Sequence, residues 1–176
     1  MLKNLIDARQ SCRNFDPTRK VEKEKLQYAL QCALTAPSAR NRQPWQYTVV
    51  SNPQTADLVR TACQMGKFNA FLDDCPVFIV AQERPQDALQ ALSKAMKLQD
   101  FRPFDVGTSL AYFTLALEEQ GVGSCYIGMF DEAKIKKAIN SNKTVRMIVA
   151  VGYPKEGDVH REKSRRDFTD SVDFVE

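Results

Sequence analysis

Histidine is nearly absent from this chain of 176 residues, which contains a single one, His160. Zinc sites built from Cys and His, and Ser-His-Asp or Cys-His catalysis, therefore have almost no raw material. No apolar run approaches membrane length, so we expect no membrane partner. A net charge of +3, with no basic run interleaved with aromatic residues, argues against nucleic acid. If the chain is an enzyme, an organic cofactor has to supply the reactivity.

A disulfide framework and a signal sequence are also missing. The five cysteines are odd in number and widely spaced, which fits reduced, mostly buried thiols. Charged residues interrupt any apolar stretch in residues 1–9, so we expect a cytoplasmic protein. The length suits one domain of ordinary size, and a hydrophobic content of 43% is enough for a core.

Helix and strand signals run through the whole chain without repeats or an evident linker. Apolar spacing predicts helices at residues 2–6, 26–34 and 53–65, and strands at 46–51 and 77–81, the latter central in a sheet. It then predicts a core helix at 105–120, a strand at 124–127, a helix at 131–139 and a strand at 145–151. Val172, Phe174 and Val175 indicate a last strand or an arm.

Gly121-Val122-Gly123 could be mistaken for a dinucleotide-binding turn. That fingerprint follows a strand and opens a helix, whereas these glycines follow a long helix and precede an apolar strand. Tyr126 also occupies the place of the third glycine. The glycines therefore predict the C-terminal cap of a helix.

Residues 36–45 contain two prolines, compact polar side chains and the only tryptophan, Trp45. The prolines exclude a helix or a central strand throughout this stretch. Polar groups held in a turn beside a large aromatic ring suit a binding wall. An ordinary loop whose tryptophan fills the core is the alternative reading.

Two basic groups lie far apart in the sequence. Arg9, Ser11 and Arg13 recur at every second residue, so in an extended segment they would project to one side. Residues 163–166 form a second compact group, Lys-Ser-Arg-Arg. Guanidinium groups and hydroxyls suit a phosphate, although either group alone could be a solvated surface.

In combination, these motifs resemble the FMN-dependent nitroreductase superfamily. The motifs that carry the resemblance are Arg9-Gln10-Ser11-Cys12-Arg13-Asn14-Phe15, Ala36-Pro37-Ser38, Asn41-Arg42-Gln43-Pro44-Trp45, Gly121-Val122-Gly123-Ser124, Val151-Gly152-Tyr153-Pro154 and Lys163-Ser164-Arg165-Arg166. The resemblance implies one α+β domain over residues 1–176, a three-layer fold with a central mixed, mostly antiparallel sheet flanked by helices. It also implies an intertwined homodimer, with residues 155–176 as an arm packing on the partner.

The resemblance implies chemistry on bound FMN rather than on a catalytic side chain or a metal. The residues expected to contact FMN are Arg9, Ser11, Arg13, Pro37, Ser38, Asn41, Asn69, Gly128, Lys163 and Arg165. Of these, Arg9, Ser11, Lys163 and Arg165 would bind the phosphate and neighbouring polar groups. Arg13 would lie against the pyrimidine side of the flavin.

The remaining contacts would surround the flavin ring. Pro37, Ser38 and Asn41 of the partner subunit would line it, with Trp45 supporting their loop. Backbone N–H groups near Gly128 would face its reactive nitrogen, and Asn69 is a weaker candidate because spacing in that region varies.

The implied activity is hydride transfer from NADH or NADPH, through FMN, to an electron-poor acceptor such as a nitroaromatic or a quinone. A flavin-binding regulator or store with little turnover is the alternative from another class. Reductive dehalogenation and flavin fragmentation are less favoured, because both depend on lid elements that the short polar connection between residues 81 and 103 does not offer.

Overall fold

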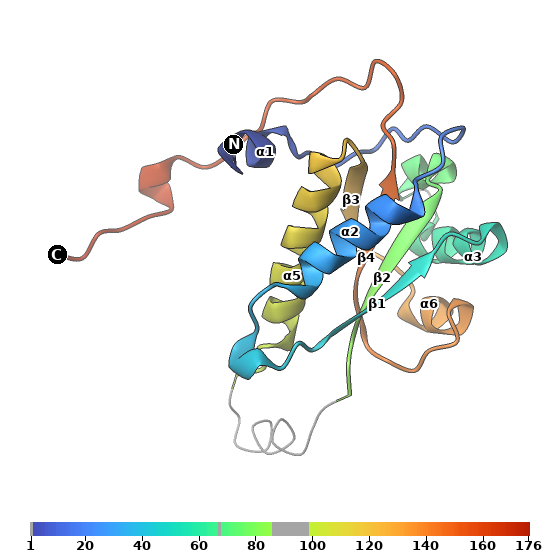
Figure 1. Ribbon diagram of the computed structural model, residues 1–176, viewed down its shortest axis with the longest axis horizontal. Coiled ribbons are helices and arrows are strands. Elements are labelled where there is room, and N and C mark those ends of the chain that lie inside the picture. Colours follow the sequence, from blue (N-terminus) through green and yellow to red (C-terminus); the bar gives the residue numbers. More distant parts are fainter. Residues whose placement is uncertain (1, 67, 86–98) are drawn as a thin grey trace.

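The computed structural model describes residues 2–66, 68–85 and 99–176, and helices and strands intermix along the chain (Figure 1). The helices are α1 (Leu2–Ala8), α2 (Lys23–Leu34), α3 (Pro53–Gln64), α5 (Arg102–Glu119) and α6 (Glu132–Ala138). The strands are β1 (Trp45–Val50), β2 (Val77–Glu83), β3 (Gly123–Ile127) and β4 (Val145–Gly152). Short 3-10 turns are η1 (Ala39–Asn41), η2 (Ala70–Asp74) and η3 (Phe168–Asp170). The elements predicted up to residue 151 are all present, with slightly shifted ends.

The strands form one sheet in the order β1-β2-β4-β3, with each neighbouring pair antiparallel. The predicted central strand β2 is buried along its whole length between β1 and β4. A single parallel bridge joins Ser11 to Ser124 at the outer edge of β3. The predicted α+β fold with a mostly antiparallel sheet is confirmed.

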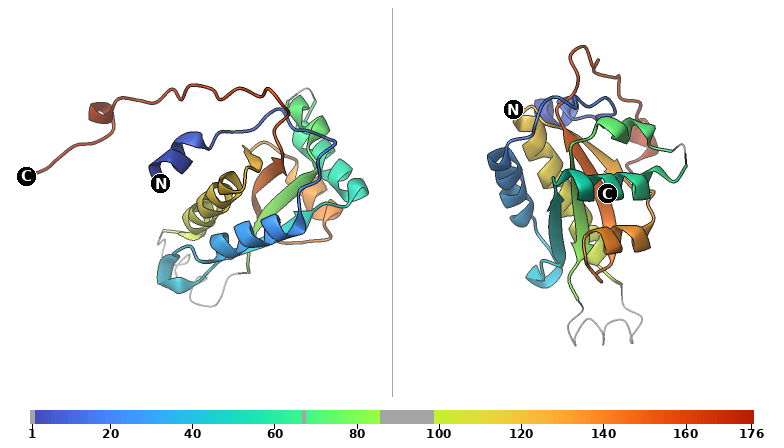
Figure 2. Two further views of the ribbon diagram at one scale, coloured as in Figure 1. Left: turned by 45° about the horizontal axis from the view of Figure 1, so that its top comes forward. Right: turned by 90° about the vertical axis from the view of Figure 1, so that its right-hand side faces the viewer.

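Helices cover both faces of the sheet, which gives the predicted three layers (Figure 2). Alternation along β2 sends Phe78 and Val80 into the core beneath α3 and α6, and Ile79 and Ala81 into the core beneath α2 and α5. Trp45 belongs to this second core and is 2% exposed. It therefore anchors the start of β1 from inside.

Local signals explain the helix ends. At the end of α5, Gly121 has a φ of +69°, and Gly121 N donates to Glu118 O at 2.9 Å. The predicted glycine cap is therefore present. The start of α5 was predicted at residue 105 but lies at Arg102, because Pro103 fits the first turn of a helix.

The C-terminal segment leaves the sheet after β4 and passes close to α1. Beyond residue 163 it is exposed and extends away from the body, as Figures 1 and 2 show. Here the rings of Phe168 and Phe174 face each other with centroids 6.3 Å apart, and both side chains are exposed. Residues 171–176 form no strand within one chain, and we call the exposed segment from residue 164 onward the arm.

Most of the polar connection predicted after β2 falls on residues 86–98, which lie outside the described residues. None of the helices in the described ranges has both the length and the apolar character needed to cross a bilayer.

Candidate active site

The first basic motif lies along the outer edge of β3. Cys12 N donates to Ser124 O at 2.9 Å, which holds residues 11–13 against the strand. The Cys12 side chain points into the core, and Arg13 is exposed. Neighbouring side chains thus lie on opposite sides of the segment at Cys12 and Arg13, as in extended backbone.

The pKa of the Cys125 thiol on β3 depends on the charged groups near this segment. Burial raises its pKa, while the positive charge of Arg13, a hydrogen bond with Ser11 and the charges of Arg161 and Arg9 act in the opposite direction. Three guanidinium groups and a hydroxyl from the 9–13 segment and the C-terminal segment therefore all act on one position of the edge strand.

The second basic motif reaches the same region. Lys163 Nζ donates to Ile6 O and to Asp7 O, both at 2.6 Å, at the end of α1. An ammonium has three donors, so one remains for another acceptor. Arg165 lies two residues further on and is exposed, and its guanidinium donates to Ser164 O at 2.6 Å. Lys163 therefore lies with the first motif, whereas Arg165 lies where the exposed arm begins.

Carboxylates also face these cations: Asp158 Oδ1 lies 3.9 Å from Arg161 Nη1, and Glu118 faces Arg9 and Lys163. Glu118, in the last turn of α5, is half-buried, and burial raises its pKa. The positive charges of Arg9, His160 and Lys163 oppose that shift. We define the cation cluster as Arg9, Arg13, Arg161 and Lys163 with the hydroxyl of Ser11. It extends from the edge of β3, where Arg13, Arg161 and Ser11 act on Cys125, to the C-terminal end of α5, where Arg9 and Lys163 act on Glu118.

The loop at residues 36–45 lies at the other end of α5. Ala39 N donates to Asp105 Oδ1 at 3.1 Å, which ties the loop to the first turns of the helix. Asp105 and Glu118 are 13 residues apart on α5, about 20 Å along the axis. Figure 1 shows η1 and α1 at opposite ends of this helix. Within one chain, Pro37, Ser38 and Asn41 are not brought to the cation cluster.

The loop itself is held in a defined shape. Ser38 Oγ accepts from Gln43 N at 2.9 Å, and Asn41 Oδ1 accepts from Gln43 Nε2 at 3.1 Å. Arg40, Asn41 and Gln43 all have positive φ values, which few residues adopt without such local support. Pro37 and Asn41 are exposed, and Ser38 is half-buried.

Gly128 and Asn69, the two remaining candidates, lie in different parts of the fold. Gly128 is exposed just after β3, and a Cβ added there would meet no heavy atom of the described chain within 4 Å. Asn69 has a φ of +56°, and its Nδ2 donates to Cys63 O at 2.9 Å, so its amide closes the end of α3.

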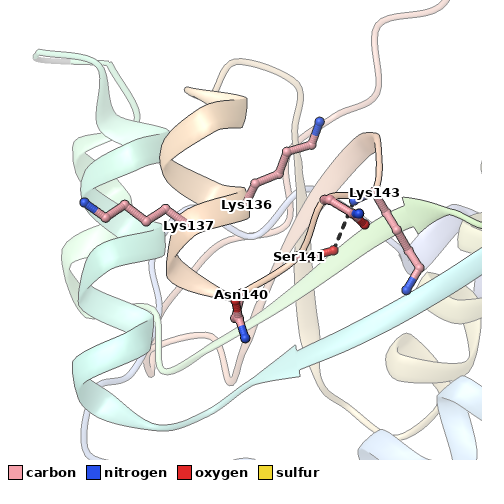
Figure 3. Close-up of a pocket in the computed structure, with 6 residues that line it drawn as sticks. Lys136, Lys137, Asn140, Ser141 and Lys143 are labelled. Carbon is pink, nitrogen blue, oxygen red and sulfur yellow. Dashed lines mark hydrogen bonds between the residues drawn. The ribbon is translucent and has the colours of Figure 1, made fainter.

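An open hollow of about 500 Å³ is lined by Lys136 and Lys137 of α6 and by the loop before β4 (Figure 3). Ser141 Oγ in that loop accepts from Lys143 N at 3.2 Å. The hollow belongs to the α3 and α6 side of the sheet, away from the cation cluster (Figure 1). Its lysines are therefore not part of the candidate site.

Comparison with known proteins decides the family. Residues 6–153 match the model of the nitroreductase family. The chain belongs to this family. Relatives include an NADH dehydrogenase of Thermus thermophilus, 31% identical over 86% of this chain and 89% of the relative, and an iodotyrosine deiodinase of Thermotoga neapolitana, 27% identical over 89% and 90%. A provisionally named nitroreductase of Exiguobacterium sibiricum, solved in complex with FMN, shares the fold with a TM-score of 0.82 and 19% identity over 99% of this chain and 97% of that one.

Family membership makes the chain a nitroreductase-type oxidoreductase, with FMN as the family's cofactor. The donors in the cation cluster fit that group, because a phosphate accepts from guanidinium, ammonium and hydroxyl donors and the cluster holds all three. Among the described residues, no group of three or more His, Cys, Asp or Glu side chains could hold a metal ion.

Sequence reasoning missed the parts of this candidate site that depend on tertiary contacts. Arg161, His160 and Glu118 all lie at the cation cluster and were not expected there. For Arg161 a signal existed, since it lies only two residues before Lys163. For Glu118 none did, because its place depends on how α1 packs on α5.

Proposed function

We propose that this chain is an FMN-dependent oxidoreductase that passes a hydride from NADH or NADPH to an electron-poor acceptor such as a nitroaromatic or a quinone. The observation that carries the proposal is the meeting of two basic motifs, more than 140 residues apart in sequence, around the end of one helix (Arg9 and Lys163 at Glu118). Bound FMN would supply the electron transfer that none of the side chains can perform.

In this proposal the cation cluster holds the phosphate. Arg9, Ser11 and Lys163 would donate to its oxygens, and Arg165, two residues beyond Lys163, would be a further donor. Arg13, whose guanidinium is permanently charged, would stabilise negative charge at the pyrimidine edge of the flavin. The N–H groups beyond Ile127, on the open side of β3, would face the flavin near Gly128.

The other wall of the site would come from a second copy of the chain. Pro37, Ser38 and Asn41 of the partner subunit would line the flavin, and Asn69 is proposed as a further contact. The 20 Å separation along α5 supports this division. A single chain holds both sets of residues but at opposite ends of the helix, so two chains related by a twofold axis would complete two sites.

Exposed apolar side chains support a homodimer. On and just before α5, Phe101, Phe104 and Tyr112 are 50%, 60% and 42% exposed, and in the arm Phe168 and Phe174 are 65% and 77% exposed. Such a large exposed apolar surface calls for a partner. Residues 155–163 contact their own chain, through Lys155 with Asp74 and through His160 and Lys163 with α1, so the predicted start of the partner contact at residue 155 is too early. We propose that the arm from residue 164 onward packs on the second subunit.

Flavin content tests the proposal. The purified protein should be yellow, should hold FMN rather than FAD, and should be bleached under anaerobic conditions by NADH, NADPH or both. Replacing Arg9 and Arg165 together with alanine should release most of the flavin, whereas Lys143→Ala, in the remote hollow, should not. A colourless protein that takes up no added FMN would contradict the proposal.

Two alternatives have distinct outcomes in the same experiment. A flavin-binding regulator would hold FMN tightly but would be bleached by neither nicotinamide. The relative named iodotyrosine deiodinase favours reductive dehalogenation as the second activity to assay. Release of iodide from iodotyrosine by the reduced protein, with no turnover of nitroaromatics or quinones, would identify that activity instead.

A further inference from the structure

Helix α1 has little packing of its own. None of its residues is buried, and Leu2 and Ile6 are 66% and 48% exposed. A helix of seven residues is too short to be stable alone. Its last carbonyl groups also have no partner within the helix. The position of α1, and of Arg9 directly after it, therefore depends on what the rest of the chain supplies.

The C-terminal segment supplies those partners. Besides the Lys163 ammonium on Ile6 O and Asp7 O, the Nε2 atom of His160 lies 3.1 Å from Asp7 O and 3.0 Å from Ala8 O. Carbonyl oxygens only accept, so His160 Nε2 carries a proton and donates. The Lys163 ammonium and the His160 imidazole, both from the C-terminal segment, thus cap the end of α1.

Gln10 fixes which residues of the C-terminal segment dock. Its Nε2 donates to Val159 O at 3.4 Å, and its Oε1 accepts from Arg161 N at 3.0 Å. An amide that bonds the main chain on both sides of His160 sets the register of the segment at that point. A shift by one residue would exchange the donor for an acceptor and would turn the neighbouring side chains to the other side.

We propose that Gln10 and His160 are positioning residues of the phosphate site: they dock residues 159–163 on the end of α1 and so hold Lys163 beside Arg9. This role rests on the proposed function, since the phosphate in question is that of FMN. Neither side chain need touch the cofactor. Their contribution is to order the two basic motifs before binding, so that binding does not have to bear that entropic cost.

Comparing the affinities for FMN and riboflavin isolates the effect of Gln10 and His160 on the phosphate site, because riboflavin lacks only the phosphate. Gln10→Met and His160→Phe should each weaken FMN binding by about three- to tenfold, the scale of one or two lost hydrogen bonds, and leave riboflavin binding unchanged. His160→Gln should bind FMN like the wild type, because its amide can still donate to the carbonyl groups. Gln54→Met, an exposed position on α3, is the matched control for the loss of an amide.

Trypsin provides a readout that needs no flavin. In the flavin-free protein, Gln10→Met and His160→Phe should be cleaved faster than the wild type between residues 161 and 166, because the segment is released from α1. Unchanged FMN binding in both variants, or an equal loss for FMN and riboflavin, would overturn the inference. A wild type that binds neither flavin would instead contradict the proposed function, and faster cleavage in the variants would still report the docking.

Discussion

Arg13 is exposed at the edge of the sheet, and its charge reaches Cys125 on the neighbouring strand. In the proposed site it would stabilise the charge that the flavin gains on reduction. Arg13→Gln should therefore lower the midpoint potential of the bound flavin and reduce turnover by about 10- to 1000-fold, as when one preorganised electrostatic contact is lost. Anaerobic titration and steady-state rates measure the two effects.

Lys143→Gln removes a positive charge far from the cluster and is the control for that substitution. An Arg13→Gln protein with the potential and turnover of the wild type would show that Arg13 has no part in tuning the flavin.

Glu118 adds a negative charge to a site that we expect to hold a phosphate. Because the folded-state pKa of its carboxyl is raised, mainly by burial, ionised Glu118 opposes folding at neutral pH, and this cost disappears as pH falls through the raised value. Glu118→Gln should therefore be more stable than the wild type at pH 7. It should also bind FMN more tightly, by a factor of about two to ten.

Both differences should shrink as the solution is acidified, since the wild-type carboxyl then becomes neutral too. The cations that face it, Arg9 and Lys163, stay charged over that range. A double variant, Glu118→Gln with His160→Gln, tests whether His160 contributes to the pH dependence. Weaker FMN binding in Glu118→Gln would mean that the carboxylate orders the cations rather than competing with the phosphate.

At the scale of elements, the helices of the α3 and α6 layer begin with side-chain caps. Asn52 Oδ1 accepts from Thr55 N, and Asp131 Oδ1 accepts from Lys134 N, both at 3.1 Å. Asn52→Ala should lower the free energy of unfolding by about 1 kcal/mol at any pH. Neither cap is near the cation cluster, so FMN binding should not change.

The pH dependence distinguishes the second cap from the first. The pKa of Asp131 is lowered, chiefly by the backbone hydrogen bond from Lys134. Its contribution is therefore present above the unfolded-state value and is lost as pH falls through the folded-state value. Asp131→Asn should remove that acid-range decrease, as seen in urea unfolding between pH 2 and 6. An acid profile identical to that of the wild type would show that Asp131 does not cap α6 in solution.

The sequence predicted elements best where one local rule decided the outcome. The apolar run after Pro76 could only be a buried strand, and Gly121 could only end the helix before it. The start of α5 was less determined, because Pro103 reads either as a loop residue or as a first-turn residue. The two basic motifs were visible, but the contacts that unite them, from Gln10 and His160, depend on a register between distant segments that no local pattern specifies.

At the scale of the whole molecule, the arm extends away from the body, and its apolar side chains remain exposed. Val172, Phe174 and Val175 are 39%, 77% and 98% exposed within one chain. If they pack on a second copy, deleting residues 168–176 should weaken dimerisation and FMN binding together, because both depend on the same contact. Sedimentation and flavin fluorescence over a dilution series measure the two.

Deletion of residues 172–176 alone retains Phe168 and serves as the graded comparison. A truncated protein that remains a flavin-loaded dimer at every dilution would show that the arm is not part of the interface.

The placement of the 36–45 loop and the cation cluster at opposite ends of α5 has a consequence for mixed populations. If each site is shared between two chains as proposed, a chain carrying Arg9→Ala and Arg165→Ala should be defective only in its phosphate half-site, and a chain carrying Ser38→Trp only in the half-site that it lends to its neighbour. Each should fail alone. Unfolded together and refolded as a mixture, they should form hybrids in which one site gathers both lesions and the other gathers none, so that yellow colour and turnover return from two inactive parents.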